Sequence, residues 1–112
     1  MTTFVAQLAS DGDTVDYRPG ADVAPGAVVV VGDLVGVTKR PIPANTLGAL
    51  ALTGVYEVPK DSTVDIPLGT LLYWDSTNQR VTPTVGSNKL FGRAVTAGPV
   101  GADRIQVRLE AR

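Results

Sequence analysis

The sequence contains no cysteine and no histidine. Without cysteine the chain has no disulfides and no thiolate metal ligands, and without histidine it lacks the commonest general base near neutral pH and most zinc sites. No apolar run reaches the length of a membrane-spanning helix. Ten basic residues balance eleven acidic ones, so the excess of basic charge typical of nucleic-acid-binding proteins is missing. We therefore expect no enzyme, no cofactor, no metal, no small-molecule substrate, no nucleic-acid partner and no membrane segment.

The composition instead favours a small all-β domain. A chain of 112 residues has the length of one domain, and its 12 glycines and 8 prolines are spread along it, as in short strands joined by turns. No segment shows helical periodicity beyond one turn. The N-terminus lacks the basic and apolar regions of a signal peptide, so we expect synthesis inside a cell.

The chain divides into residues 1–13 and a single β domain over residues 14–112. The first segment has one apolar stretch, Phe4–Leu8, and then a polar turn cluster that ends at Asp13. Two interpretations stay open for it: an arm that orders only against a partner, or an edge strand of the domain itself. As an arm, its candidate contact residues are Thr2, Thr3, Phe4, Val5, Ala6, Gln7 and Leu8.

Alternation and turn residues predict the strands of the domain. The apolar run Ala27–Val31, which ends in four valines, predicts a strand buried on both faces. Gly32-Asp33 predicts a two-residue hairpin turn after this strand. Residues 48–58 are expected to form one long strand with a bulge or bend at Gly54. Residues 58–62 are predicted to be an exposed connection. Further strands are expected at residues 14–18, 34–38, 71–74, 80–82, 89–95 and 104–109.

The strand pattern occurs twice. Gly26 leads the valine run as Gly69 leads the strand from Leu71, an offset of 43 residues. The Leu-x-Gly motif at Leu34 recurs at Leu90, an offset of 56 residues. The difference falls in one connection, which is much longer in the second copy. This pseudo-repeat predicts two similar β units packed on one core, and no catalytic residue type repeats with them.

The charged residues lie in patterns that favour structural roles. Asp11 with Asp13, and Asp61 with Asp65, lie in turn-like stretches, and the first pair lacks the spacing of a calcium loop. Residues 32–39 superficially resemble a phosphate loop, but a proline-rich stretch follows where a helix is required. The arginines near the C-terminus are interleaved with acidic residues and predict a solvated or interfacial strand face; they are Arg93, Arg104, Arg108 and Arg112.

The few aromatic residues leave a choice between core and interface. Trp74, the only tryptophan, ends the most hydrophobic strand. We favour a core position for it, with an anchor at a subunit interface as the alternative. Phe91 poses the same question. Phe4, in the N-terminal segment, favours an interface.

Several stretches follow one another in a recognisable order along nearly the whole chain. The most specific are Gly-Val-Tyr-Glu-Val-Pro-Lys at 54–60 and Leu-Tyr-Trp-Asp at 72–75, with weaker stretches at 12–17, 25–30, 34–37, 47–53, 68–71, 90–94 and 107–109. Together they resemble the capsid cement, or head-decoration, proteins of tailed phages. Members have also carried the label of a RecA/RadA-type recombinase, which does not suit a chain without a nucleotide loop. The Pro-Ile-Pro stretch at 41–43 departs from the polar turn expected there.

The resemblance implies a small antiparallel β-barrel or sandwich of the β-tulip or β-clip type. It also implies a homotrimer on local three-fold axes of the expanded head. Such a protein is made in the host cytoplasm, binds the major capsid protein on the outside of the virion and stabilises the shell against the pressure of packaged DNA. Two alternatives stay open: another virion component from the tail or head completion, and a small nucleic-acid-binding barrel.

Overall fold

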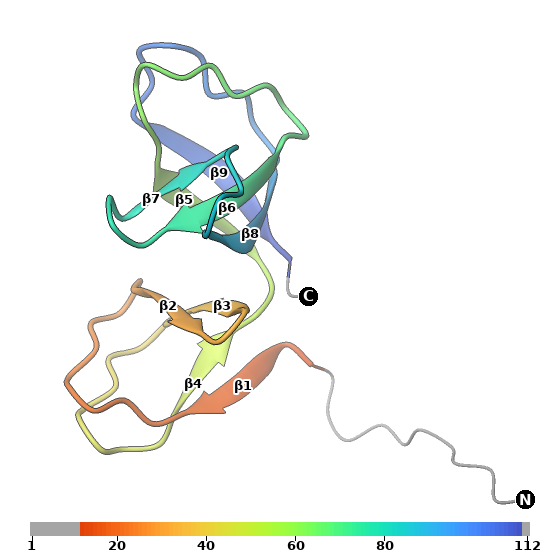
Figure 1. The fold of residues 1–112 in the computed structure, drawn as a ribbon. Helices are drawn as coiled ribbons and strands as arrows, with labels where there is room; N and C mark the ends of the chain where they lie inside the picture. Colours follow the sequence, from red (N-terminus) through yellow and green to blue (C-terminus); the bar gives the residue numbers. More distant parts are fainter. Residues whose placement is uncertain (1–11, 111–112) are drawn as a thin grey trace, which may run out of the picture.

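The computed structural model describes residues 12–110 as an all-β protein. These residues form nine strands in two antiparallel sheets and contain no helix, so no helix there is long and apolar enough to span a bilayer (Figure 1). The predicted fold class is confirmed. The strands are β1 (Thr14–Tyr17), β2 (Val28–Val31), β3 (Leu34–Val37), β4 (Gly48–Ala51), β5 (Val55–Pro59), β6 (Leu71–Asp75), β7 (Arg80–Thr82), β8 (Lys89–Ala94) and β9 (Arg104–Leu109).

The N-terminal sheet has the strand order β1-β4-β3-β2. The predicted hairpin between β2 and β3 is present: Val31 pairs with Leu34, and Gly32 in the turn has a φ of 60°. The prediction that β2 is buried on both faces is wrong. This strand lies at the sheet edge, and Val31 is 46% exposed. A run of valines gives the same sequence signal in an edge strand as in a central strand, so the pattern alone does not separate the two positions.

The C-terminal sheet has the strand order β5-β9-β8-β6-β7. Its two edge strands come together, because Lys60, just after β5, forms a parallel bridge with Val81 of β7. The expectation of one long strand over residues 48–58 is wrong. β4 and β5 belong to different sheets, and Gly54, with a φ of 116°, lies where the chain crosses from one sheet to the other.

The pseudo-repeat is visible in the topology. β4, β3 and β2 lie side by side in the first sheet as β9, β8 and β6 do in the second, and β1 flanks β4 as β5 flanks β9. β7 has no counterpart in the first sheet. It lies in the connection between β6 and β8, where the sequence showed the extra residues.

Loop contacts repeat with the same offsets. Val23 exchanges two backbone hydrogen bonds with Ile42, each 2.9 Å, and Ile66 exchanges two with Gly98, each 2.8 Å. The first partners differ by 43 residues and the second by 56, as in the strands. The Pro-Ile-Pro stretch therefore has a regular counterpart in the second unit, although its sequence is unusual.

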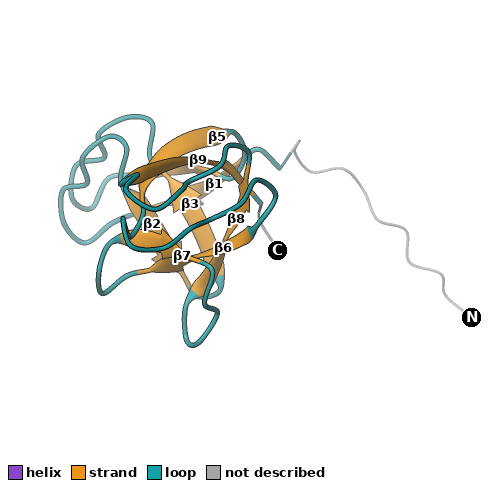
Figure 2. Ribbon diagram, turned by 90° about the horizontal axis from the view of Figure 1, so that it is seen from above, coloured by secondary structure: helices purple, strands orange, loops and turns teal. Residues whose placement is uncertain are grey.

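One hydrophobic core joins the two sheets. Val35 and Val37 of β3 are buried in the same cluster as Leu72 and Phe91 of the C-terminal sheet. Trp74 is 5% exposed, and its ring centroid lies 5.8 Å from that of Phe91. Both aromatic residues therefore occupy the core of the protein. Figure 2 shows the strands gathered at the centre of the molecule with the loops around them.

The connection after β5 is partly buried, contrary to the expectation for residues 58–62. Val58 and Lys60 are each only 4% exposed. The Lys60 ammonium group donates hydrogen bonds to three backbone carbonyl oxygens, of Asp61 at 2.8 Å, Ala102 at 2.9 Å and Pro99 at 3.3 Å. It therefore connects two loops at the end of the C-terminal sheet. Gly98 leaves room for its stem, since a Cβ there would lie 2.9 Å from Lys60 Cδ.

Candidate functional site

The predicted contact arm, Thr2 to Leu8, lies outside the described residues. The described chain begins at Gly12 and enters β1, which lies at an edge of the N-terminal sheet (Figure 1). Thr14, Val15 and Asp16 are exposed along this strand. The arm stays a prediction. The first described strand, β1, lies at an exposed edge of its sheet.

Two of the carboxylates are occupied by turn hydrogen bonds. Asp61 Oδ1 accepts from the Thr63 amide at 2.9 Å and from the Thr63 hydroxyl at 2.7 Å, and these bonds lower the pKa of Asp61. Asp75 accepts from the side-chain amide of Asn78 at 2.8 Å and from two backbone amides of the same turn, and these bonds lower its pKa too. Of the pairs considered from the sequence, Asp11 lies outside the described residues. Asp61 serves the turn role that we predicted for it.

A third carboxylate connects the two sheets. Asp33, in the turn of the β2–β3 hairpin, accepts a hydrogen bond of 2.6 Å from the Lys89 ammonium group of β8. This hydrogen bond and the lysine charge lower the pKa of Asp33. Because the pair is exposed, it orients the hairpin more than it stabilises the fold.

A hollow of about 370 Å³ lies beside β1 and β4. Its lining is mainly apolar and comes from the loop of residues 39–47 and from the two strands, with Ile42, Leu47, Ala49 and Ala51 among its members. Leu47 is 56% exposed at its rim. Within the described part of the chain, no group of three or more acidic residues could hold a metal ion here or elsewhere. The hollow has the composition of a contact surface.

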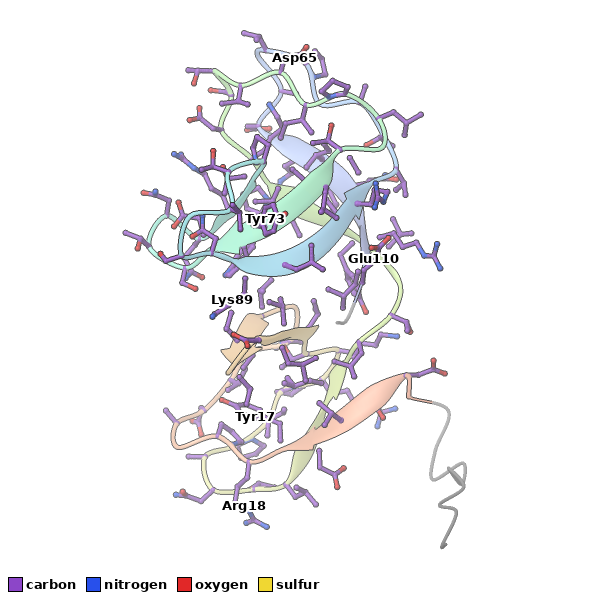
Figure 3. The ribbon with its side chains drawn as sticks, turned by 45° about the vertical axis from the view of Figure 1, so that its right-hand side comes forward. Tyr17, Arg18, Asp65, Tyr73, Lys89 and Glu110 are labelled. Carbon is purple, nitrogen blue, oxygen red and sulfur yellow. The ribbon has the colours of Figure 1, made fainter. Side chains whose placement is uncertain are left out.

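The outer face of the C-terminal sheet is the second candidate surface, and we call it the arginine face. Its members alternate with core residues along three neighbouring strands and are all exposed: Val55, Glu57 and Pro59 of β5, Arg104, Gln106 and Arg108 of β9, Arg93 of β8 and the adjoining Val95. Figure 3 shows Glu110 at one side of this unit. Glu110 lies 3.6 Å from Arg93 in an ion pair.

The arrangement offers surfaces for binding. Alternation of Arg104, Gln106 and Arg108 with buried neighbours could be recognised from the sequence. The prediction of a strand face is confirmed for Arg93, Arg104 and Arg108, whereas Arg112 lies outside the described residues. The hollow could not, because its walls come together only when the loop of residues 39–47 folds beside β1 and β4.

Comparison with known proteins gives one family. A family model described as phage cement protein matches residues 9–109, nearly the whole chain. No curated protein matches the chain. No solved structure matches it either.

Proposed function

We propose that the chain, which belongs to the phage cement protein family and so has a structural role in the phage capsid, decorates the outside of the expanded head. There it binds the major capsid protein as a homotrimer at local three-fold axes. It stabilises the shell against the internal pressure of packaged DNA. The protein is made in the host cytoplasm and incorporated into the virion.

The family match over residues 9–109 carries this proposal. The physical properties of the subunit support it. Its two sheets share one core, and the edges of the C-terminal sheet meet at the bridge between Lys60 and Val81. Such a body transmits load between neighbouring shell subunits without rearranging. Three linked copies bind more firmly than one, since the second and third contacts form at high effective concentration.

In this proposal the chain has two functional parts. Residues 1–13 form the arm, and Thr2 to Leu8 add a strand to an exposed edge of the shell protein, as extended segments do in β-augmentation. Residues 14–112 form the domain that carries the arm. The position of β1 at the edge of the N-terminal sheet supports this division, because an arm leaving an edge strand meets no neighbouring strand of its own sheet.

Occupancy of purified heads tests the function. Expanded heads lacking the protein are incubated with the full chain or with a variant lacking residues 2–8, and bound copies are counted against the major capsid protein. We expect hundreds of copies of the full chain and a loss of at least about tenfold in affinity for the deletion. This loss corresponds to about 1.4 kcal/mol of binding free energy, and an added strand forms several main-chain hydrogen bonds worth about 0.5–1.5 kcal/mol each. The unfolding temperature of the deletion variant provides the control for folding. Equal occupancy by both proteins would refute the arm, and no binding by either would refute the decoration role.

A further inference from the structure

The edge strand β1 has backbone groups that are directed away from its sheet (Figure 1). The carbonyl oxygen of Asp13 accepts a 2.8 Å hydrogen bond from the Leu52 amide, so the backbone of Asp13 faces β4. The direction of the backbone groups alternates along an antiparallel pair. The amides and carbonyls of Thr14 and Asp16 are therefore directed to the open side of β1, where the described residues place no strand. These groups form a template for one more strand.

The same part of β1 borders the hollow. Thr14 lines it together with Ala49 and Ala51 of β4. The register places Thr14 opposite Ala51 and Asp16 opposite Ala49, so these four side chains share one face of the sheet. The two alanines are short, which leaves the floor of the hollow low. A strand added to β1 would place its own side chains beside Thr14 and Asp16, and apolar side chains there would cover this side of the hollow.

The stretch before β1 has the pattern of such a strand. Apolar side chains occur at alternating positions, Phe4, Ala6 and Leu8. The five residues between Leu8 and Thr14 contain the polar turn cluster, in which Gly12 has a φ of 77°. Glycine favours this left-handed conformation, and loops of five residues are common in β-hairpins. The sequence therefore allows the chain to reverse its direction immediately before β1.

The hydrophobic pattern selects one register for this hairpin. When Leu8 lies opposite Thr14, Ala6 lies opposite Asp16, and both fall on the face of the hollow. These pairs also use the two positions of β1 whose backbone groups are directed outward. A shift by one residue would place Gln7 on the face of the hollow in place of Leu8, so this shifted register is disfavoured.

We propose that Phe4–Leu8 pairs with β1 of the same copy and covers the hollow, so that the arm is held on its own domain until the shell protein displaces it. The occupant is the chain's own segment, because its covalent attachment to β1 gives it a high effective concentration at this edge. The pairing itself does not depend on the proposed function. The displacement rests on it, since the same residues cannot pair with β1 and with the shell at once. The pairing then lowers the affinity for the shell by the fraction of copies in which the arm is released.

Amide hydrogen exchange tests the pairing. The full chain is compared with the variant lacking residues 2–8 by nuclear magnetic resonance. We expect the amides of Thr14 and Asp16 to exchange at least about tenfold more slowly in the full chain, whereas the Val107 amide of β9 should exchange alike in both proteins. Leu8→Asp should lose this protection, and Gln7→Asp, on the opposite face, should keep it. Equal exchange at Thr14 and Asp16 in the full chain and the deletion would overturn the proposal.

Pairs of introduced cysteines test the register and the identity of the occupant, since the wild type has no cysteine. Leu8→Cys/Thr14→Cys should form an intramolecular disulfide under mild oxidation, because the Cα atoms of a hydrogen-bonded pair lie about 5.5 Å apart, within the range of disulfides. Gln7→Cys/Thr14→Cys is the matched control and should form one much more slowly, because its side chains lie on opposite faces. Disulfide-linked dimers would assign the segment to a second copy, and equal rates for the two pairs would exclude the register. Either result would overturn the proposal.

Occupancy of expanded heads separates this proposal from the proposed function. Oxidised Leu8→Cys/Thr14→Cys should bind heads at least about tenfold more weakly than the same protein after reduction, since the disulfide prevents release of the arm. Equal binding before and after reduction would overturn the displacement. Protected amides in a wild type that does not bind heads would refute the decoration role and leave the pairing intact. Unprotected amides in a wild type that binds heads would refute the pairing and leave the decoration role intact.

Discussion

Replacement of Lys60 by methionine measures how much the buried ammonium group stabilises the loops at the end of the C-terminal sheet. Methionine keeps an unbranched apolar stem and removes the three donors. The carbonyls of Asp61 and Pro99 each keep a backbone hydrogen bond, from Val64 at 3.2 Å and from Ala102 at 3.0 Å. The Ala102 carbonyl has no other hydrogen bond from the described residues.

The expected loss follows from this count. A fully buried carbonyl without a partner costs about 1–3 kcal/mol, and the half-buried Ala102 carbonyl should cost an amount near the lower end of this range. The two weakened carbonyl sites add to this cost, and removal of the buried lysine charge offsets part of it. We expect Lys60→Met to lower the free energy of unfolding by about 2–3 kcal/mol. For a domain of this size that corresponds to about 8–12 °C in the unfolding temperature.

The assay is urea and thermal unfolding followed by circular dichroism, at one protein concentration because association shifts both midpoints. Lys39→Met is the matched control, since Lys39 is exposed and makes no hydrogen bond or ion pair in the described part of the chain. It should change stability by less than about 0.5 kcal/mol. If the two variants unfolded alike, the carbonyl contacts of Lys60 would contribute nothing and the reasoning would be refuted.

Two further predictions concern the close strand approach and acid stability. Gly92→Ala would place a Cβ against the Arg108 carbonyl group of β9, and the carbonyl carbon would lie only 2.8 Å from that Cβ. We therefore expect β8 to separate from β9 and the variant to show no cooperative thermal transition. Gly20→Ala is the control, because its added Cβ would lie in open space, and it should unfold like the wild type. Turn hydrogen bonds hold the pKa of Asp61 and of Asp75 below the ordinary value of 3.8, so their contribution to stability is complete above about pH 5 and is lost as the pH falls through the folded values. Stability measured from pH 6 to 2 should therefore fall more steeply for the wild type than for Asp75→Asn, and equal slopes would contradict this role.

Local patterns were sufficient to predict much of this fold. The hairpin at Gly32-Asp33 follows from turn chemistry, which depends on two adjacent residues. The recurrence of a strand after Gly26 and Gly69 predicts two related units. The two sheets show this relation in their strand orders, β1-β4-β3-β2 in the first and β5-β9-β8-β6 in the second. The core position of Trp74 was favoured because its strand is the most hydrophobic in the chain.

The incorrect predictions concern residues whose environment is set by distant parts of the chain. Gly54 has the same sequence signature at a bulge as at a crossing between sheets, and only pairing with distant strands separates the two. The sequence around Lys60 predicts an exposed residue. Only folding brings the carbonyls of the 99–102 loop within hydrogen-bond distance of its ammonium group. The contacts that we propose between the arm and the shell depend on another molecule, which the order of residues in one chain does not contain.

The bridge between β5 and β7 has a consequence for the protein before assembly. It joins the two edges of the C-terminal sheet at one point, whereas β1 and β2 have unpaired backbone along one side in the described structure. β2 consists of four consecutive valines, and its unpaired side is a place where another polypeptide could add a strand. Free copies of the protein are therefore exposed to strand addition at β2, and early capture by a partner would reduce this risk.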